Sequence, residues 1–171
     1  MEITTLDRLL EDELKDIYNA ENQLLEALPN LARAAESDDL RASFERHLQQ
    51  TRIHIRRLEE ICRDLKIEPS GKTCAGMAGL IKEGEDVIES EMGSEPKQAA
   101  LIGAAQRLEH YEIAAYGTAR AHARQLGYGK AFDILTQTLN EEKESDQKLT
   151  QFAENRANVQ AAMSGGSVDV D

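Results

Sequence analysis

The most constraining feature of the sequence is the spacing of its apolar residues in four long segments. In the first, apolar residues recur every three or four positions from Leu6 to Leu31. This spacing places the apolar side chains on one face of an α-helix. The pattern returns at Leu40–Leu65, Leu101–Leu126 and Phe132–Ala153. The sequence therefore predicts four long amphipathic helices.

Capping and helix-breaking residues set the expected ends of these helices. The first helix is expected over residues 5–36, with Thr4 and Asp7 forming a capping box at its start. Pro29 lies inside this helix and should kink it, because the proline ring displaces a carbonyl of the preceding turn. A complete break at Pro29 is the alternative.

A shorter helical pattern lies between the second and third long segments. Residues 72–94 carry apolar residues at helical spacing, interrupted by glycines, and we interpret them as a helix that crosses between two antiparallel hairpins. The hairpins also resemble each other, since sliding 18–58 onto 109–149 without a gap aligns Glu21 with Glu112. Two hairpins joined by one crossover are typical of the ferritin-like fold. The sequence thus predicts an all-α, ferritin-like four-helix bundle with a short crossover helix.

The 171 residues fit one domain, with the bundle expected over residues 1–160 and a disordered tail over 161–171. A formal net charge of −12 disfavours binding to nucleic acid and to anionic membrane surfaces. No apolar run approaches the length of a membrane span. The two cysteines form no CxxC pair or disulfide framework, so reduced thiols and a cytoplasmic location are expected.

Four acidic residues fall on the apolar faces of the predicted helices. Glu21 lies between apolar residues of the first helix, and the other three are Glu112, Glu142 and Asp146. Glu21 and Glu112 precede their hairpin turns by similar numbers of residues, so the four should meet at one height. Buried carboxylates repel one another and need cations, and Lys and Arg are nearly absent from these faces. The pattern predicts bound metal, with a metal-free polar network as the alternative.

The ferritin-like di-iron pattern takes one Glu from each of two helices and a Glu-x-x-His from each of the other two. This sequence matches the pattern in part. The second helix has Thr51 in place of the Glu, and the last helix has Ser145 in place of the His. The predicted metal ligands are therefore Glu21, His54, Glu109, Glu112, Glu142 and Asp146.

Neighbouring residues leave alternatives open. Gln50 is the alternative to His54 as the ligand from the second helix, and His47 is expected to hydrogen-bond ligands or water. Tyr18 and Tyr111 are expected either as neighbours of the site or as plain core residues. Carboxylates with some imidazole suit iron or manganese, and they also accept zinc.

Several stretches resemble a known family. The segments YNAENQLLEALPNLA, FERHLQQT and LEHYEIAAYGT, followed by LNEEKESDQKL, resemble the YciE/YciF family of bacterial ferritin-like proteins. The resemblance implies a ferritin-like fold, a homodimer, a di-iron centre and an association with bacterial stress responses. The family's usual carboxylate at position 50 is replaced here by Gln50. That departure makes the second helix the part of the site that differs most from the family.

Three functions follow as hypotheses. In the first, the protein binds two iron ions per chain and reacts Fe(II) with dioxygen or hydrogen peroxide during stress. In the second, it is a structural or interaction protein whose metal site is vestigial or only stabilising. In the third, it assembles into an iron-storage shell. Nothing in the sequence indicates a Ser/His/Asp triad or a glycine-rich phosphate loop.

Overall fold

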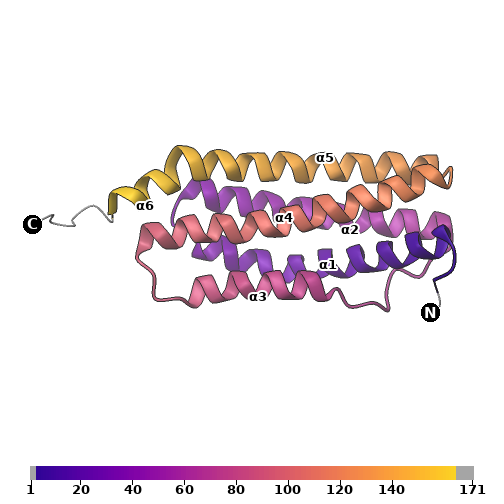
Figure 1. The fold of residues 1–171 in the computed structure, drawn as a ribbon, viewed down its shortest axis with the longest axis horizontal. Helices are drawn as coiled ribbons and strands as arrows, with labels where there is room; N and C mark the ends of the chain where they lie inside the picture. The colour runs from indigo at the N-terminus through magenta and orange to yellow at the C-terminus, as the bar shows by residue number, and fades with distance from the viewer. Residues whose placement is uncertain (1–2, 165–171) are drawn as a thin grey trace, which may run out of the picture.

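The computed structural model describes residues 3–164. Its long helices run along one another as two antiparallel hairpins, α1 with α2 and α4 with α5 (Figure 1). The described part of the chain is all-α, and the predicted ferritin-like four-helix bundle is confirmed. Its elements are α1 (Leu6–Ala34), α2 (Asp38–Leu65), α3 (Ala75–Glu89), α4 (Ser94–Gln125), α5 (Gly129–Phe152), a π-helical turn (Ala153–Ala157) and α6 (Asn158–Ser164).

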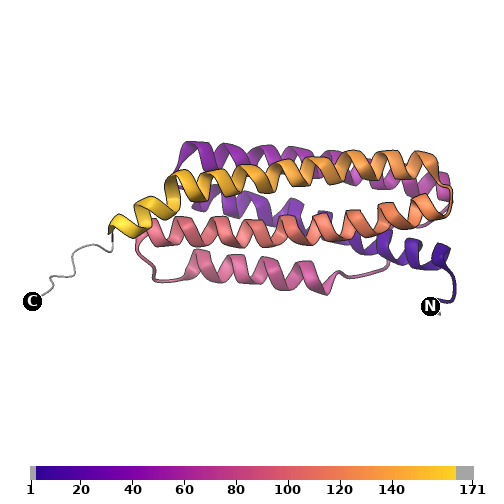
Figure 2. The same ribbon diagram turned by 45° about the horizontal axis from the view of Figure 1, so that its top comes forward.

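The crossover helix α3 lies outside the four-helix core, along α1 and α4 (Figure 2). Cys74 caps its first turn by accepting a bond from the amide of Met77 at 3.4 Å. Tyr111 of α4 contacts the Cys74 thiol at 2.8 Å. A Cβ at Gly76 would lie 2.8 Å from the Tyr111 ring, so only glycine allows this close approach. The loop before α3 is thereby fixed to the bundle.

The helix ends differ from expectation by a few residues. Thr5, not Thr4, is the N-cap of α1, and its side chain accepts a bond from the amide of Arg8 at 3.3 Å. Pro29 lies inside α1, which continues to Ala34, so the alternative of a complete break is wrong. Gly127, with φ of +76°, follows the end of α4.

The predicted tail lies partly within the described chain. Residues 161–164 belong to α6, whereas residues 165–171 lie outside the described residues. None of the described helices is both long and apolar enough to cross a membrane.

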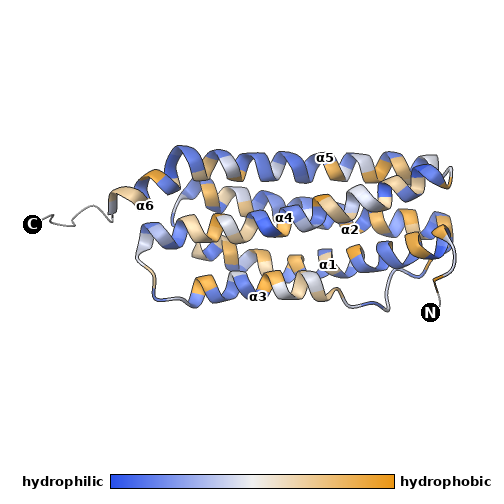
Figure 3. Ribbon diagram, in the orientation of Figure 1, coloured by the Kyte–Doolittle hydropathy of each residue, from blue (hydrophilic) through white to orange (hydrophobic). Residues whose placement is uncertain are grey.

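The buried apolar residues form two separate clusters along the bundle. One includes Leu24 and Leu108, and the other includes Ile17 and Tyr116. Figure 3 shows the polar residues interspersed with apolar ones along each long helix. On α1, Glu21 lies between Ile17 and Leu24, so the polar interior separates the two clusters. Each of the four long helices contributes a buried polar residue there, namely Glu21, Thr51, Glu112 and Glu142.

Candidate metal centre

Five of the six predicted site residues meet in the middle of the bundle. Each is at most 2% exposed, and they come from α1, α2, α4 and α5. His47 of α2 joins them and is 4% exposed. The five are Glu21, His54, Glu109, Glu112 and Glu142.

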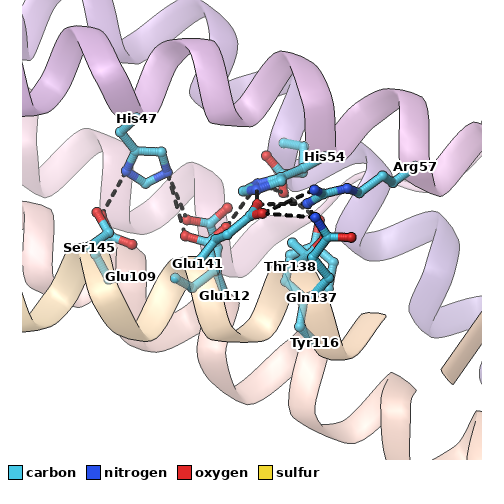
Figure 4. Close-up of polar contacts among 12 residues, drawn as sticks. His47, His54, Arg57, Glu109, Glu112, Tyr116, Gln137, Thr138, Glu141 and Ser145 are labelled. Atoms are coloured by element: carbon cyan, nitrogen blue, oxygen red, sulfur yellow. Dashed lines mark hydrogen bonds and ion pairs between the residues drawn. The ribbon is translucent and has the colours of Figure 1, made fainter. Parts of the chain in front are cut away.

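Helix periodicity explains how two elements supply most of the cluster. His47 and His54 are seven residues apart, which is two turns, so both project from the same face of α2 (Figure 4). Glu109 and Glu112 are three residues apart and share a face of α4. The seven-residue spacing was a signal in the sequence that would have placed His47 beside His54.

The first group of potential ligands surrounds His47. One ligand atom from each of its four members lies within 4.8 Å of the others. The Nδ1 atom of His47 is 2.7 Å from Oε1 of Glu109. Its Nε2 atom is 3.6 Å from Oε2 of Glu112 and 3.7 Å from Oε2 of Glu142. These residues could hold a metal ion.

The second group surrounds His54. Its Nδ1 atom is 2.9 Å from Oε1 of Glu142 and 3.2 Å from Oε1 of Glu21. Glu142 belongs to both groups, and its two oxygens face different histidines. A carboxylate placed in this way can bridge two cations.

Partners on the outer side hold His54 in place. Its Nε2 atom is 2.8 Å from Oε2 of Glu141, which also accepts bonds of 2.6 and 3.0 Å from Arg57. Because the Glu141 carboxylate binds Nε2 of His54, Nδ1 remains free to bind a metal. The sequence did not indicate this role of Glu141 and Arg57, because it depends on how α2 and α5 pack against each other. In the structure their side chains are only 25% and 17% exposed.

Other hydrogen bonds fix two of the glutamates. The Ser145 hydroxyl donates to Oε1 of Glu109 at 2.7 Å. The buried Tyr116 hydroxyl donates to Oε1 of Glu21, and the sequence had not singled out this tyrosine. The signal for Tyr116 was its place on the α4 stripe one turn after Glu112.

Asp146, Tyr18 and Tyr111 lie outside the cluster. The Oδ1 atom of Asp146 is 3.1 Å from Nε2 of Gln106 and 3.3 Å from Nε2 of His110, and Asp146 is in neither potential metal group. Tyr18 and Tyr111 donate instead to Glu59 and Asp16, respectively.

Gln50 is half-buried and also belongs to neither group. The histidines of α2, rather than its amides, therefore face the acidic residues.

Proton affinities in the cluster show how crowded its charges are. Burial by itself lowers the pKa of His47, but the charge and hydrogen bond of Glu109 outweigh it and raise this pKa to about 9. Burial likewise opposes charge on His54, yet contacts with Glu141 and Glu142 raise its pKa to about 11. Without a metal ion, both imidazoles bind protons at neutral pH.

The pKa values of two glutamates are raised as well. Burial, followed by the charges of Glu142 and Glu21, raises the pKa of Glu112 well above its usual value. Burial also raises the pKa of Glu142 to about 7, against the effect of His54. Protons thus supply the neutralising charge that a bound cation would otherwise supply.

The unpaired atoms of the cluster fit bound metal. Buried polar atoms are nearly always hydrogen-bonded, yet both carboxylate oxygens of Glu112 and Nε2 of His47 have no partner among the described residues. One oxygen of Glu21 and one of Glu109 are also unpartnered. Most of these atoms are carboxylate oxygens that face one another, and such oxygens can bind a metal ion through their lone pairs. Four carboxylates and two imidazoles are the ligand types that iron, manganese and zinc accept.

Comparisons with known proteins agree with this architecture. A family model described as "Domain of unknown function (DUF892)" matches residues 5–162. Protein YciF of Escherichia coli strain K12 is 44% identical over 164 residues, which cover 94% of this chain and 98% of that protein.

Solved structures extend the comparison. The crystal structure of the E. coli stress protein YciF has a TM-score of 0.88 and 43% identity, and the match covers 91% of this chain and 99% of that one. YcfI of Rhodopseudomonas palustris, described as a candidate structural protein, has a TM-score of 0.84 and 40% identity, with 87% and 95% covered. The chain therefore belongs to the DUF892 family and is a relative of YciF, as its sequence motifs predicted.

Proposed function

We propose that the protein binds two metal ions per chain, with iron as the physiological metal, and oxidises Fe(II) with hydrogen peroxide or dioxygen during stress. The observation that carries this proposal is the shared carboxylate of Glu142. Its oxygens lie 2.9 Å from Nδ1 of His54 and 3.7 Å from Nε2 of His47. A carboxylate that belongs to both groups can bind two cations that lie side by side.

Each metal position has its own set of residues. Glu112 and Nε2 of His47 would hold one ion, and Glu21 and Nδ1 of His54 would hold the other, with Glu142 between them. Glu109 either binds the first ion through its unpartnered Oε2 or keeps the tautomer of His47 through Oε1. The count of four glutamates and two histidines equals that of the ferritin-like di-iron pattern. Its distribution is different, because both histidines come from α2.

Bound Fe(II) would supply the electrons of this reaction, one from each of two ions, and two protons would also be needed to convert one hydrogen peroxide to two water molecules. The chain's own residues would prepare this reaction. Four carboxylates balance the charge of the divalent pair. The two apolar clusters exclude bulk water from the site, and Tyr116 and Glu141 keep Glu21 and His54 in position.

The test is anaerobic addition of Fe(II) followed by hydrogen peroxide. The proposal predicts two iron ions bound per chain and a ferric absorption band that forms at a ratio of one peroxide to two iron ions. Failure to bind iron at micromolar concentrations would refute it. The name of the E. coli relative as a stress protein supports the proposed setting.

The second candidate is a structural protein with a vestigial site, which the description of the R. palustris relative favours. Glu112→Gln separates the two candidates. Under the first, this substitution removes metal binding and peroxide consumption. Under the second, it only relieves a buried charge, so the free energy of unfolding rises and no activity is lost.

We propose further that the protein is a cytoplasmic homodimer, as the family resemblance implies. Both Cys62 and Cys74 are buried free thiols, which suits a reducing compartment. Light scattering distinguishes a dimer from a storage shell, because the two differ widely in mass.

A further inference from the structure

Thr51 has a buried hydroxyl with no hydrogen-bond partner among the described residues. The side chain is fully buried, at 0% exposed, and its Oγ1 atom is unpaired. A threonine inside a helix commonly donates to the backbone carbonyl one turn earlier, and Thr136 does so with Phe132 at 2.7 Å. Thr51 makes no such hydrogen bond to the backbone of its helix. Its hydroxyl is therefore available to a group that is not part of the chain.

Thr51 shares a face of α2 with the histidines of both metal groups. His47 lies four residues earlier and His54 three residues later, so all three project from one face of α2. Along the helix, Thr51 thus lies between the histidine of one group and the histidine of the other.

The internal repeat gives an independent reason to expect a ligand there. The offset that aligns Glu21 with Glu112 also aligns Thr51 of α2 with Glu142 of α5. Glu142 is the carboxylate shared by the two groups. A centre with the same ligands from both hairpins would have a second glutamate at position 51. This chain has the shorter, uncharged side chain of Thr51 there. One side of the metal pair is thereby left without a charged protein ligand.

We propose that Thr51 positions a small exogenous anion of the class of azide, hydroxide or peroxide between the two metal positions, opposite Glu142. The hydroxyl donates a hydrogen bond to the anion, and the metal ions would attract the anion's negative charge. Thr51 is thus a positioning residue, and the inference rests on the proposed metal centre.

The test uses Co(II), whose visible absorption reports its ligands, bound azide included, and which azide neither oxidises nor reduces. Metal-free wild-type protein, Thr51→Val and Thr51→Ser are loaded with Co(II) and titrated with azide. Valine keeps the shape of threonine without the hydroxyl, and serine keeps the hydroxyl. All three should bind two Co(II) ions per chain. We expect azide to bind about tenfold more weakly to Thr51→Val, and Thr51→Ser to retain most of the wild-type affinity.

Each other outcome overturns the inference in a distinguishable way. Equal azide affinities in wild type and Thr51→Val, with normal Co(II) binding, would overturn it while leaving the metal centre intact. Loss of Co(II) by Thr51→Val alone would also overturn it, because the hydroxyl would then hold the metal or the fold. Absence of Co(II) binding in the wild type would remove the proposed centre and the inference with it.

Discussion

Glu142 and His54 face each other between α5 and α2, with Oε1 of the carboxylate 2.9 Å from Nδ1 of the imidazole. The opposite oxygen of Glu142 faces His47 at 3.7 Å. One side chain therefore reaches both potential metal groups, whereas Glu21 and Glu112 each belong to one. Substitution of Glu142 is therefore expected to affect metal binding differently from substitution of Glu21 or Glu112.

Neutralising Glu142 should affect both positions, and neutralising Glu21 only one. We predict that Glu142→Gln reduces bound manganese or iron from two ions per chain to none at micromolar metal, and that Glu21→Gln reduces it to one. Equilibrium dialysis with elemental analysis measures this. Glu144→Gln is the matched control, because Glu144 is exposed on the same helix, and it should retain two ions. Equal losses from Glu21→Gln and Glu142→Gln would contradict the shared role.

His47 and Asp146 give opposite predictions. His47 is buried against three glutamates, so His47→Gln should lose the metal position beside Glu112 and retain one ion per chain. Asp146 accepts a hydrogen bond from Gln106 and belongs to neither metal group, so Asp146→Asn should retain both ions. The same metal analysis tests the pair. Loss of metal from Asp146→Asn would show that Asp146 moves into the site when metal binds.

Glu141 should act on the metal through His54. Replacing it by Gln keeps its size but removes the charge that fixes the Nε2–H of His54. We predict a 10- to 100-fold weaker affinity, roughly, at the His54 position only. Calorimetric titration would resolve the two sites. If both sites weaken equally, the effect is a general loss of negative charge, which Glu144→Gln would reproduce.

The metal-free protein should become less stable as the pH rises. The pKa values of His47 and His54 are raised to about 9 and about 11, and that of Glu112 is also raised. The folded state therefore binds more protons than the unfolded state above pH 6.5, and its stability falls with pH. Between pH 6.5 and 8.5 we predict a loss of at least about 1 kcal/mol in the free energy of unfolding.

Urea denaturation of chelator-treated protein measures this loss. With saturating metal, the decrease of the free energy of unfolding with pH should weaken or reverse, because metal binding displaces the protons from the histidines and Glu112. Stability that rises with pH in the metal-free protein would show that the histidines are not charged in the folded state.

The sequence predicted most of the bundle because its signals are local and repeated. Apolar spacing determines which face of each helix is buried, and Gly127 marks the end of α4. The inward direction of Glu21, Glu112 and Glu142 follows from the same periodicity. These residues interrupt otherwise apolar stripes, so their burial could be inferred without knowing which helices are neighbours.

The rest of the cluster depends on which neighbour each side chain meets. Asp146 and Ser145 both lie near the inner face of α5, but Asp146 bonds to Gln106 of α4, and Ser145 bonds to Glu109 inside the site. Periodicity gives a direction for each residue, and it does not choose between such partners. Glu141 was missed for the same reason, since its pairing with Arg57 across α2 and α5 requires the packing of two helices.

Anomalous diffraction from crystals grown with Mn(II) tests the central claim most directly. The account predicts two anomalous peaks per chain, one beside Nε2 of His47 and Glu112, the other beside Nδ1 of His54 and Glu21, with Glu142 in contact with both. The absence of peaks in the bundle interior, or peaks confined to surface carboxylates, would contradict it.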